Sequence, residues 1–198
     1  IDDRILIQSI VGKEFTKNLS FSAFFNFTSQ IGNGFKYKKD SENNEIRELT
    51  TRIFSPAYFQ LGSGFLWKKD ESLWVNYSPV AARLILVSKK FTSSLSENET
   101  YFGVTQNKSS RYELGSNLTF HSEGTLFENV NYKQDLKLFS NYLENPSNID
   151  LDYLAQIEID VNPLLSTQLI FQLIYDDNAI ARLQVREVFG VGVQLKLN

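Results

Sequence analysis

Apolar and polar residues alternate over long stretches of this chain, and that alternation limits the folds open to it more than any other feature. In the segment 19–31, the two sets of alternate positions are Phe21, Ala23, Phe25 and Phe27 against Ser20, Ser22, Asn26 and Thr28. The segments 150–159 and 165–176 repeat the pattern. Successive side chains of a β-strand point to opposite faces, so each segment has one apolar face and one polar face.

The alternation indicates nine strands, which we expect at 4–12, 19–31, 56–67, 73–87, 110–120, 130–142, 150–159, 165–176 and 185–197. About nine to eleven residues are enough for a tilted strand to cross a bilayer, and these segments reach that length. We therefore predict an all-β fold, an antiparallel transmembrane β-barrel with lipid against its apolar faces and a polar lumen. A chain of 198 residues suits one such domain over 1–198.

The expected connections alternate in length. The short ones are 13–18, 68–72 and 160–164, the segment 121–129 is intermediate, 143–149 and 177–184 are medium, and 32–55 and 88–109 are long and polar. Outer-membrane barrels have short periplasmic turns and longer extracellular loops. This assignment places the protein in the cell outer membrane, with its C-terminus in the periplasm and Ile1 outside. Because bacterial barrels have even strand counts, we expect this chain to be the C-terminal portion of a larger barrel.

Composition excludes several classes of protein. The chain has no Cys, which excludes disulfides and Cys-ligated metal sites. Its net charge is −3 and it has no basic tract, so we expect no nucleic-acid partner. No run of eighteen apolar residues is present, which excludes a membrane-spanning helix.

Aromatic residues fall near the expected strand ends. On the lipid-facing register we expect a girdle of Tyr142, Tyr153 and Tyr175 at the outer rim and Trp67 and Tyr132 at the periplasmic rim. Amphipathic rings prefer the headgroup level of a bilayer. The alternative explanation is that aromatic residues are simply good strand formers.

A soluble β-barrel or sandwich would show the same alternation, with its apolar faces turned inward. The strand lengths, the difference between the two sets of connections and the rim tyrosines favour the membrane.

The inward register carries charges of both signs: Arg111, Glu113, Lys133, Asp135, Lys137, Asp152, Glu158 and Arg186. Pairing across a turn at 121–129 would put Glu113 opposite Lys137, and opposite charges across a ladder attract. Such pairs would neutralise charges in a narrow lumen. We expect an ionic network that rigidifies or plugs the barrel, and a selectivity lining for a solute is the alternative. Gly190 and Gly192 fall on the same register and would leave room in the lumen.

Several stretches resemble one protein family. They include Ser55-Pro56-Ala57-Tyr58-Phe59-Gln60-Leu61-Gly62, Leu138-Phe139-Ser140-Asn141-Tyr142-Leu143-Glu144-Asn145-Pro146, Leu173-Ile174-Tyr175-Asp176-Asp177 and Glu187-Val188-Phe189-Gly190-Val191-Gly192. Together these resemble an uncharacterised family of Bacteroidota outer-membrane proteins, domain of unknown function 3078. The resemblance implies an outer-membrane barrel with about three further N-terminal strands, hence roughly twelve in all. It implies no activity. The end Leu197-Asn198 departs from the aromatic residue on which members tend to finish.

Catalytic and metal chemistry finds little support. His121 and Ser122 are adjacent, so on a regular strand they would point to opposite faces and could not cooperate, and we expect His121 to be a solvated turn residue. Asp176-Asp177 lacks a nearby His partner. Asp150, Asp152 and Asp176 could line a Ca²⁺ site, but Asp at strand ends more often serves turns. Glycines at 32–34 and 62–64 mark bends or close backbone approach. We predict no catalytic residues, metal or cofactor.

Three functions follow from this interpretation. The first is a non-enzymatic outer-membrane barrel, narrow or plugged, that passes or binds small solutes. The second is a barrel subunit of a larger envelope complex for secretion, lipid export or barrel assembly, with other outer-membrane or periplasmic proteins as partners. A less apolar seam at Ser116, Gln134 and Thr167, and Glu187 on the outward register, mildly suggest it. The third is an outer-membrane hydrolase, which the separation of His121 from Ser122 disfavours.

Overall fold

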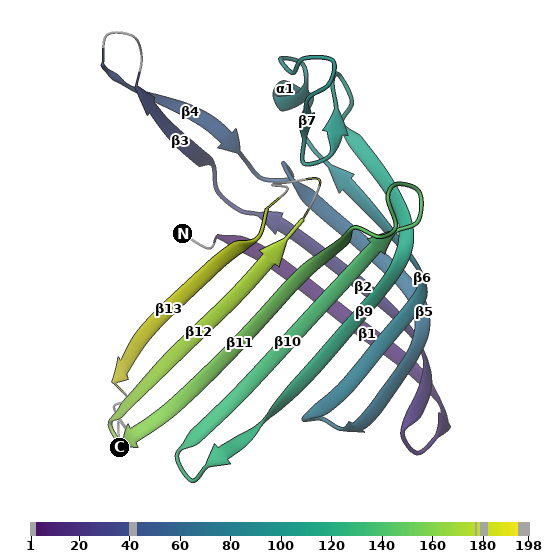
Figure 1. The fold of residues 1–198 in the computed structure, drawn as a ribbon, viewed down its shortest axis with the longest axis vertical. Coiled ribbons are helices and arrows are strands. Elements are labelled where there is room, and N and C mark those ends of the chain that lie inside the picture. Colours follow the sequence, from purple (N-terminus) through teal and green to yellow (C-terminus); the bar gives the residue numbers. More distant parts are fainter. Residues whose placement is uncertain (1–2, 40–42, 177, 179–181, 194–198) are drawn as a thin grey trace. The chain divides into compact units, whose positions relative to one another are not determined.

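The protein is described by a computed structural model that covers residues 3–39, 43–176, 178 and 182–193. Nine long strands form one antiparallel sheet in the order β1-β2-β5-β6-β9-β10-β11-β12-β13 (Figure 1). Their bounds are β1 Arg4–Thr16, β2 Leu19–Gln30, β5 Ala57–Asp70, β6 Leu73–Leu86, β9 Ser110–Phe127, β10 Val130–Asn141, β11 Ile149–Asn162, β12 Leu165–Tyr175 and β13 Gln184–Val193. The all-β class and the nine expected strands are confirmed. The part of the last expected strand at 194–197 lies outside the described residues.

Two-residue connections at 17–18, 71–72, 128–129 and 163–164 alternate with longer ones. The prediction of an intermediate connection at 121–129 is wrong, because β9 continues to Phe127. The polar stretch around Gly124 looks like a turn in the sequence. In the structure, Gly124 pairs with Tyr132, and a Cβ built on Gly124 would lie 3.1 Å from Cε1 of that ring. An aromatic ring beside a strand glycine supplies the packing that the glycine lacks, so the strand continues.

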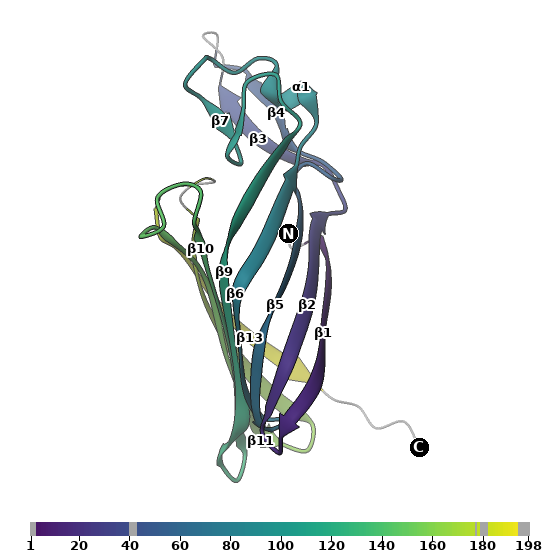
Figure 2. The ribbon, with the colours of Figure 1, turned by 90° about the vertical axis from the view of Figure 1, so that its right-hand side faces the viewer.

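The two longest connections contain structure that the sequence did not predict. β3 (Gly34–Lys39) and β4 (Glu45–Thr51) form a separate hairpin. In this hairpin Lys38 forms a salt bridge with Glu48, and the Arg47 guanidinium lies 3.4 Å from the ring centroid of Phe35. The other connection holds α1 (Lys89–Thr92), β7 (Thr100–Tyr101) and β8 (Val104–Thr105), with α1 packed beside β7 (Figure 2). Within the described ranges, no helix is long and apolar enough to cross a membrane.

The chain divides into two compact units. Unit 1 contains Ile1–Val11, Ala23–Gly62 and Ala81–Leu114, and unit 2 contains Gly12–Ser22, Ser63–Val80 and Gly115–Asn198. Unit 1 has a small apolar core in which Ile85, Val87 and Val104 are buried, packed against Tyr58, Tyr101 and Phe102.

Unit 2 buries polar side chains and exposes apolar ones. Within the part of the chain that the structure describes, its buried residues other than glycine are Phe139 and seven polar residues: Ser22, Asn76, Ser78, Asn117, His121, Asn141 and Gln172. Its exposed large apolar residues include Trp67, Leu169, Val185, Phe189 and Val191, and Phe189 is 66% exposed. This is the reverse of the distribution in water-soluble domains.

Candidate functional site

The polar face of unit 2 is set by the register of β9 to β13. Directly opposite residues on neighbouring antiparallel strands share a face. One row across the sheet holds Glu123, Lys133 and Gln156, the next holds His121, Asp135, Leu154, Gln172 and Arg186, and a third holds Thr119, Lys137 and Asp152. A fourth row holds Asn131, Glu158, Gln168 and Gly190. The sheet therefore brings six of the predicted lumen residues to one face: Lys133, Asp135, Lys137, Asp152, Glu158 and Arg186.

His121 is buried on this face beside two partly exposed carboxylates. Its Nδ1 is 2.8 Å from Oδ1 of Asp135, and its Nε2 is 3.5 Å from Oε2 of Glu123. The imidazole stacks on Trp74 at 5.3 Å between ring centroids. The expectation of a solvated turn histidine is therefore wrong, because residue 121 lies well inside β9. Ser122 lies on the other face, where its hydroxyl is 3.2 Å from that of Tyr132.

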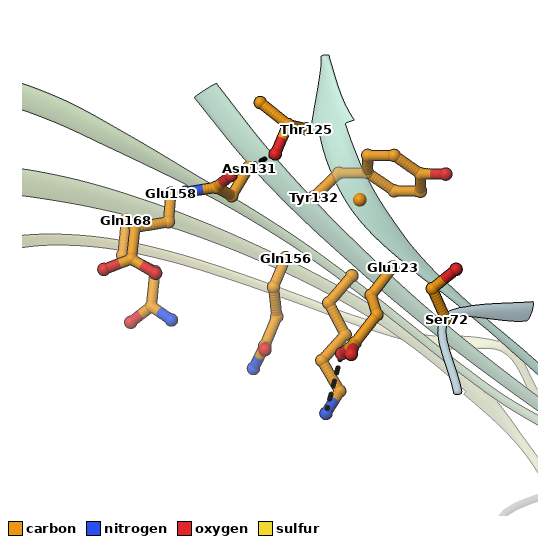
Figure 3. Close-up of a pocket in the computed structure, with 10 residues that line it drawn as sticks. Ser72, Glu123, Thr125, Asn131, Tyr132, Gln156, Glu158 and Gln168 are labelled. Carbon is orange, nitrogen blue, oxygen red and sulfur yellow. Dashed lines mark hydrogen bonds and ion pairs between the residues drawn. The ribbon is translucent and has the colours of Figure 1, made fainter. Parts of the chain in front are cut away.

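A pocket of about 390 Å³ opens on the same face, near the two-residue turns. It is lined by Ser72, by Gly124 and Tyr132, and by seven polar side chains of β9, β10, β11 and β12: Glu123, Thr125, Asn131, Lys133, Gln156, Glu158 and Gln168 (Figure 3). Lys133 Nζ is 3.8 Å from Glu123 Oε2, and Thr125 donates to Asn131 Oδ1 over 2.9 Å.

A second polar group in unit 2 depends on a glycine. Ser22 of β2 donates to Asn76 Oδ1 of β6 over 2.5 Å, although β5 lies between these strands. Two strand spacings amount to about 9.5 Å, which short side chains span only if the intervening strand presents none. A Cβ on Gly64 of β5 would run into the backbone of Tyr77 and Ser78, so this glycine lets β5 and β6 approach closely. The close approach expected at 62–64 is confirmed at Gly64.

In unit 1, two arginines surround one buried carboxylate. Arg83 Nε lies 2.5 Å from Oε2 of Glu113, and Arg111 Nε lies 2.8 Å from Oε1, outside hydrogen-bond alignment. Arg111 also donates to the carbonyl of Gly103 over 3.0 Å. The Glu113 side chain is fully buried. Arg111 and Glu113 were both expected on the inward register, and the structure brings them together.

The expected pair of Glu113 with Lys137 is wrong. The turn at 128–129 places Lys137 opposite Thr119 on β9 and Asp152 on β11. Position 119 is six residues from Glu113, or about 20 Å along a strand. The misplaced turn is the reason for the error.

Arg83 was missed because the alternation of β6 changes phase. Asn76 and Ser78 are buried, but after Pro79 the buried positions become Ala81 and Ile85, with the Arg83 side chain 11% exposed. A proline inside a strand often accompanies a bulge, so Pro79 was the available signal.

None of the five expected girdle residues stands in the four polar rows, although Tyr132 also lines the pocket. Trp67 and Tyr132 lie near two-residue turns, and Tyr175 ends β12, where its hydroxyl donates to Asn148 Oδ1. Tyr142 follows β10 and donates to the Pro79 carbonyl. Tyr153 lies further along its strand, opposite Leu136 and Leu173, and donates to Gln134 Oε1 over 3.0 Å.

The three residues of the suggested seam, Ser116, Gln134 and Thr167, pair with Ser140, Ser122 and Ile159 and so belong to three separate rows. Glu187 lies opposite Phe171, beside a hollow of about 540 Å³ lined by Ala155 and Phe189.

The expected acidic groups do not assemble a metal site. Within the described ranges, no three His, Asp or Glu residues gather in a geometry that could hold a metal ion. Asp152 instead accepts from Gln172 Nε2 over 2.9 Å. Asp177 lies outside the described residues.

No protein-family model matches the sequence, and neither the curated proteins nor the solved structures include a significant match to it.

Proposed function

We propose that the chain is part of a transmembrane β-barrel of the bacterial outer membrane, with a narrow polar lumen that binds or passes small solutes. The nine strands would belong to a closed barrel of roughly twelve, between filled eight-stranded barrels and open porins. The polar faces would line the lumen and the apolar faces would contact lipid. The proposal includes membership of the Bacteroidota outer-membrane family that the sequence stretches resemble.

The reversed burial of unit 2 carries the proposal. A soluble barrel or sandwich would turn side chains such as Leu169, Val185 and Phe189 inward, yet they lie exposed while His121 and Asn76 are buried. Each such apolar side chain forgoes about 1.5–3 kcal/mol when left in water. Lipid at the apolar face would recover that free energy. The strands, of ten to eighteen residues, reach the length that spanning requires.

The two tryptophans of the chain provide the test. Trp67 is 41% exposed on the apolar face, whereas Trp74 stacks on His121 on the polar face. The single-tryptophan variants Trp74→Phe and Trp67→Phe would be reconstituted into vesicles that contain brominated lipid. We expect quenching of Trp67 fluorescence and protection of Trp74. Equal protection of both, or quenching of Trp74 alone, would count against a lipid-facing apolar surface.

Passage of solutes needs its own measurement. Single-channel recording of the reconstituted full-length protein in a planar bilayer should give small, stable conductance steps if the lumen is open. A silent protein that still passes the quenching test would leave solute binding inside a plugged lumen.

A second function is favoured by Glu187, which lies on an otherwise apolar surface opposite Phe171. A charge facing lipid is destabilising unless it lies near an interface. In a barrel subunit of a larger envelope complex, a protein partner would cover this surface. Mild extraction and size measurement would distinguish the two functions, because a stable assembly that Glu187→Leu disperses would favour the complex.

A further inference from the structure

We propose that the pocket of unit 2 binds a neutral, hydroxyl-rich solute of about the size of a monosaccharide, held by Gln156, Glu158 and Gln168. This inference deepens the proposed function, since it names the solute class that the polar face would take.

The three side chains are neighbours with uncommitted hydrogen-bonding groups. Glu158 of β11 lies directly opposite Gln168 of β12, and Gln156 is the next residue of β11 on the same face. In the part of the chain that the structure describes, no hydrogen bond or ion pair engages these three side chains. The other charged groups of the pocket are engaged with each other, because Lys133 faces Glu123. Figure 3 shows Glu158 and Gln168 together, with Gln156 between them and Glu123.

The chemistry of this set matches hydroxyl groups. Each amide offers two donors and one acceptor oxygen, and the carboxylate accepts at two oxygens. A hydroxyl both donates and accepts, so neighbouring hydroxyls can satisfy amides and a carboxylate together. The carboxylates of Glu123 and Glu158 would repel an anion such as phosphate, and Lys133 would offset only one of these two negative charges. An apolar solute would leave the pocket's polar groups unpaired, which is unfavourable.

The size of the pocket fits the same class. At about 30 Å³ for each water-sized group, a volume of 390 Å³ holds roughly a dozen such groups. The row that contains Glu158 and Gln168 continues to Gly190 of β13, which presents no side chain to this face. A Cβ at Gly190 would come no closer than 4.0 Å to the carbonyl oxygen of Gln168, so the end of the row is open.

The test is a titration of the full-length protein with glucose, followed by saturation-transfer NMR. The protein would be held in a zwitterionic detergent, because a maltoside detergent would itself offer hydroxyl groups. We expect Gln156→Ala and Gln168→Ala each to weaken binding by about five- to tenfold, as the loss of one hydrogen bond predicts. Gly190→Leu, which fills the open end, should weaken it further.

Gln134→Ala is the matched control, because it removes the same side chain from the opposite face, where Gln134 accepts from Tyr153. It should bind glucose as the native chain does. Absence of glucose binding, equal binding by all variants, or a stronger response to phosphate or choline would overturn the inference. The titration needs no bilayer, so its failure is separable from failure of the lipid-quenching test on Trp67 and Trp74.

Discussion

His121 of β9 and Asp135 of β10 face each other directly across the ladder, with Nδ1 2.8 Å from a carboxylate oxygen. A carboxylate only accepts, so Nδ1 is the donor of this hydrogen bond. The bond joins two strands on a face where Trp74 covers the imidazole.

The substitution His121→Ala should lower the free energy of unfolding by about 1–3 kcal/mol, because the half-buried Asp135 carboxylate loses its donor and Trp74 loses the ring stacked on it. Urea unfolding in detergent, followed by tryptophan fluorescence, measures the change. Ser122→Ala removes a polar group from the neighbouring position on the opposite face and should have a much smaller effect. Equal losses for the two variants would show that His121 has no special role.

The substitution Glu113→Gln should be more damaging, at about 3–5 kcal/mol, because two arginines would remain against a side chain without charge. The same unfolding measurement applies. Glu48→Gln removes a carboxylate from an exposed pair with Lys38 and should unfold like the native protein. A native free energy of unfolding for Glu113→Gln would mean that other groups compensate the charges of Arg83 and Arg111.

Gly64→Ala and Gly115→Ala should each destabilise the sheet by about 1–3 kcal/mol or more, because the added methyl group would collide with the backbone of the adjacent strand. At Gly115 the obstacle is the Ser140 carbonyl. Gly190→Ala is the control, since its methyl group meets only an ordinary contact at 4.0 Å. Thermal unfolding of the three variants would rank them, and similar melting temperatures would contradict the prediction.

Tyr101 gives a pH dependence. Its hydroxyl donates to the carbonyls of Thr50 and Ser55, which ties the segment 88–109 to the end of the β3–β4 hairpin and to the turn that follows it. Burial raises the pKa of Tyr101 from 10.0 to about 12. The folded pKa of this acid exceeds the unfolded value, so its stabilisation is complete below pH 10 and is lost as the pH rises through about 12.

Amide hydrogen exchange in the segment 88–109 should therefore accelerate between pH 10 and 12 beyond the intrinsic base-catalysed rate. Tyr101→Phe should weaken protection at neutral pH by about 1 kcal/mol and remove the extra pH dependence. An unchanged pH profile in that variant would assign the effect to another group.

The sequence located the strands because alternation over ten or more residues is a repeated signal, as in Phe21 to Thr28. It could not locate the turn at 128–129, because Gly124 looks like a breaker until Tyr132 is known to lie beside it. That error moved the partner of Lys137 by six residues and hid the buried position of His121.

The rest of the candidate site depends on contacts between distant segments. Arg83 meets Glu113 after β6 changes phase at Pro79, and Ser22 bonds to Asn76 across the intervening strand β5. The β3–β4 hairpin did carry a local signal, since Phe35 and Tyr37 alternate with lysines. Its high charge made it look like an irregular loop.

The reversed burial of unit 2 has a consequence for how this chain can become folded. Most domains gain their stability from an apolar interior, which they carry with them into any aqueous compartment. Among the described residues of unit 2, Phe139 is the one large apolar side chain that is buried, and many apolar side chains are exposed. The stability of unit 2 therefore depends on the surrounding solvent as well as on the sequence. If the proposed function holds, folding is coupled to insertion into the bilayer.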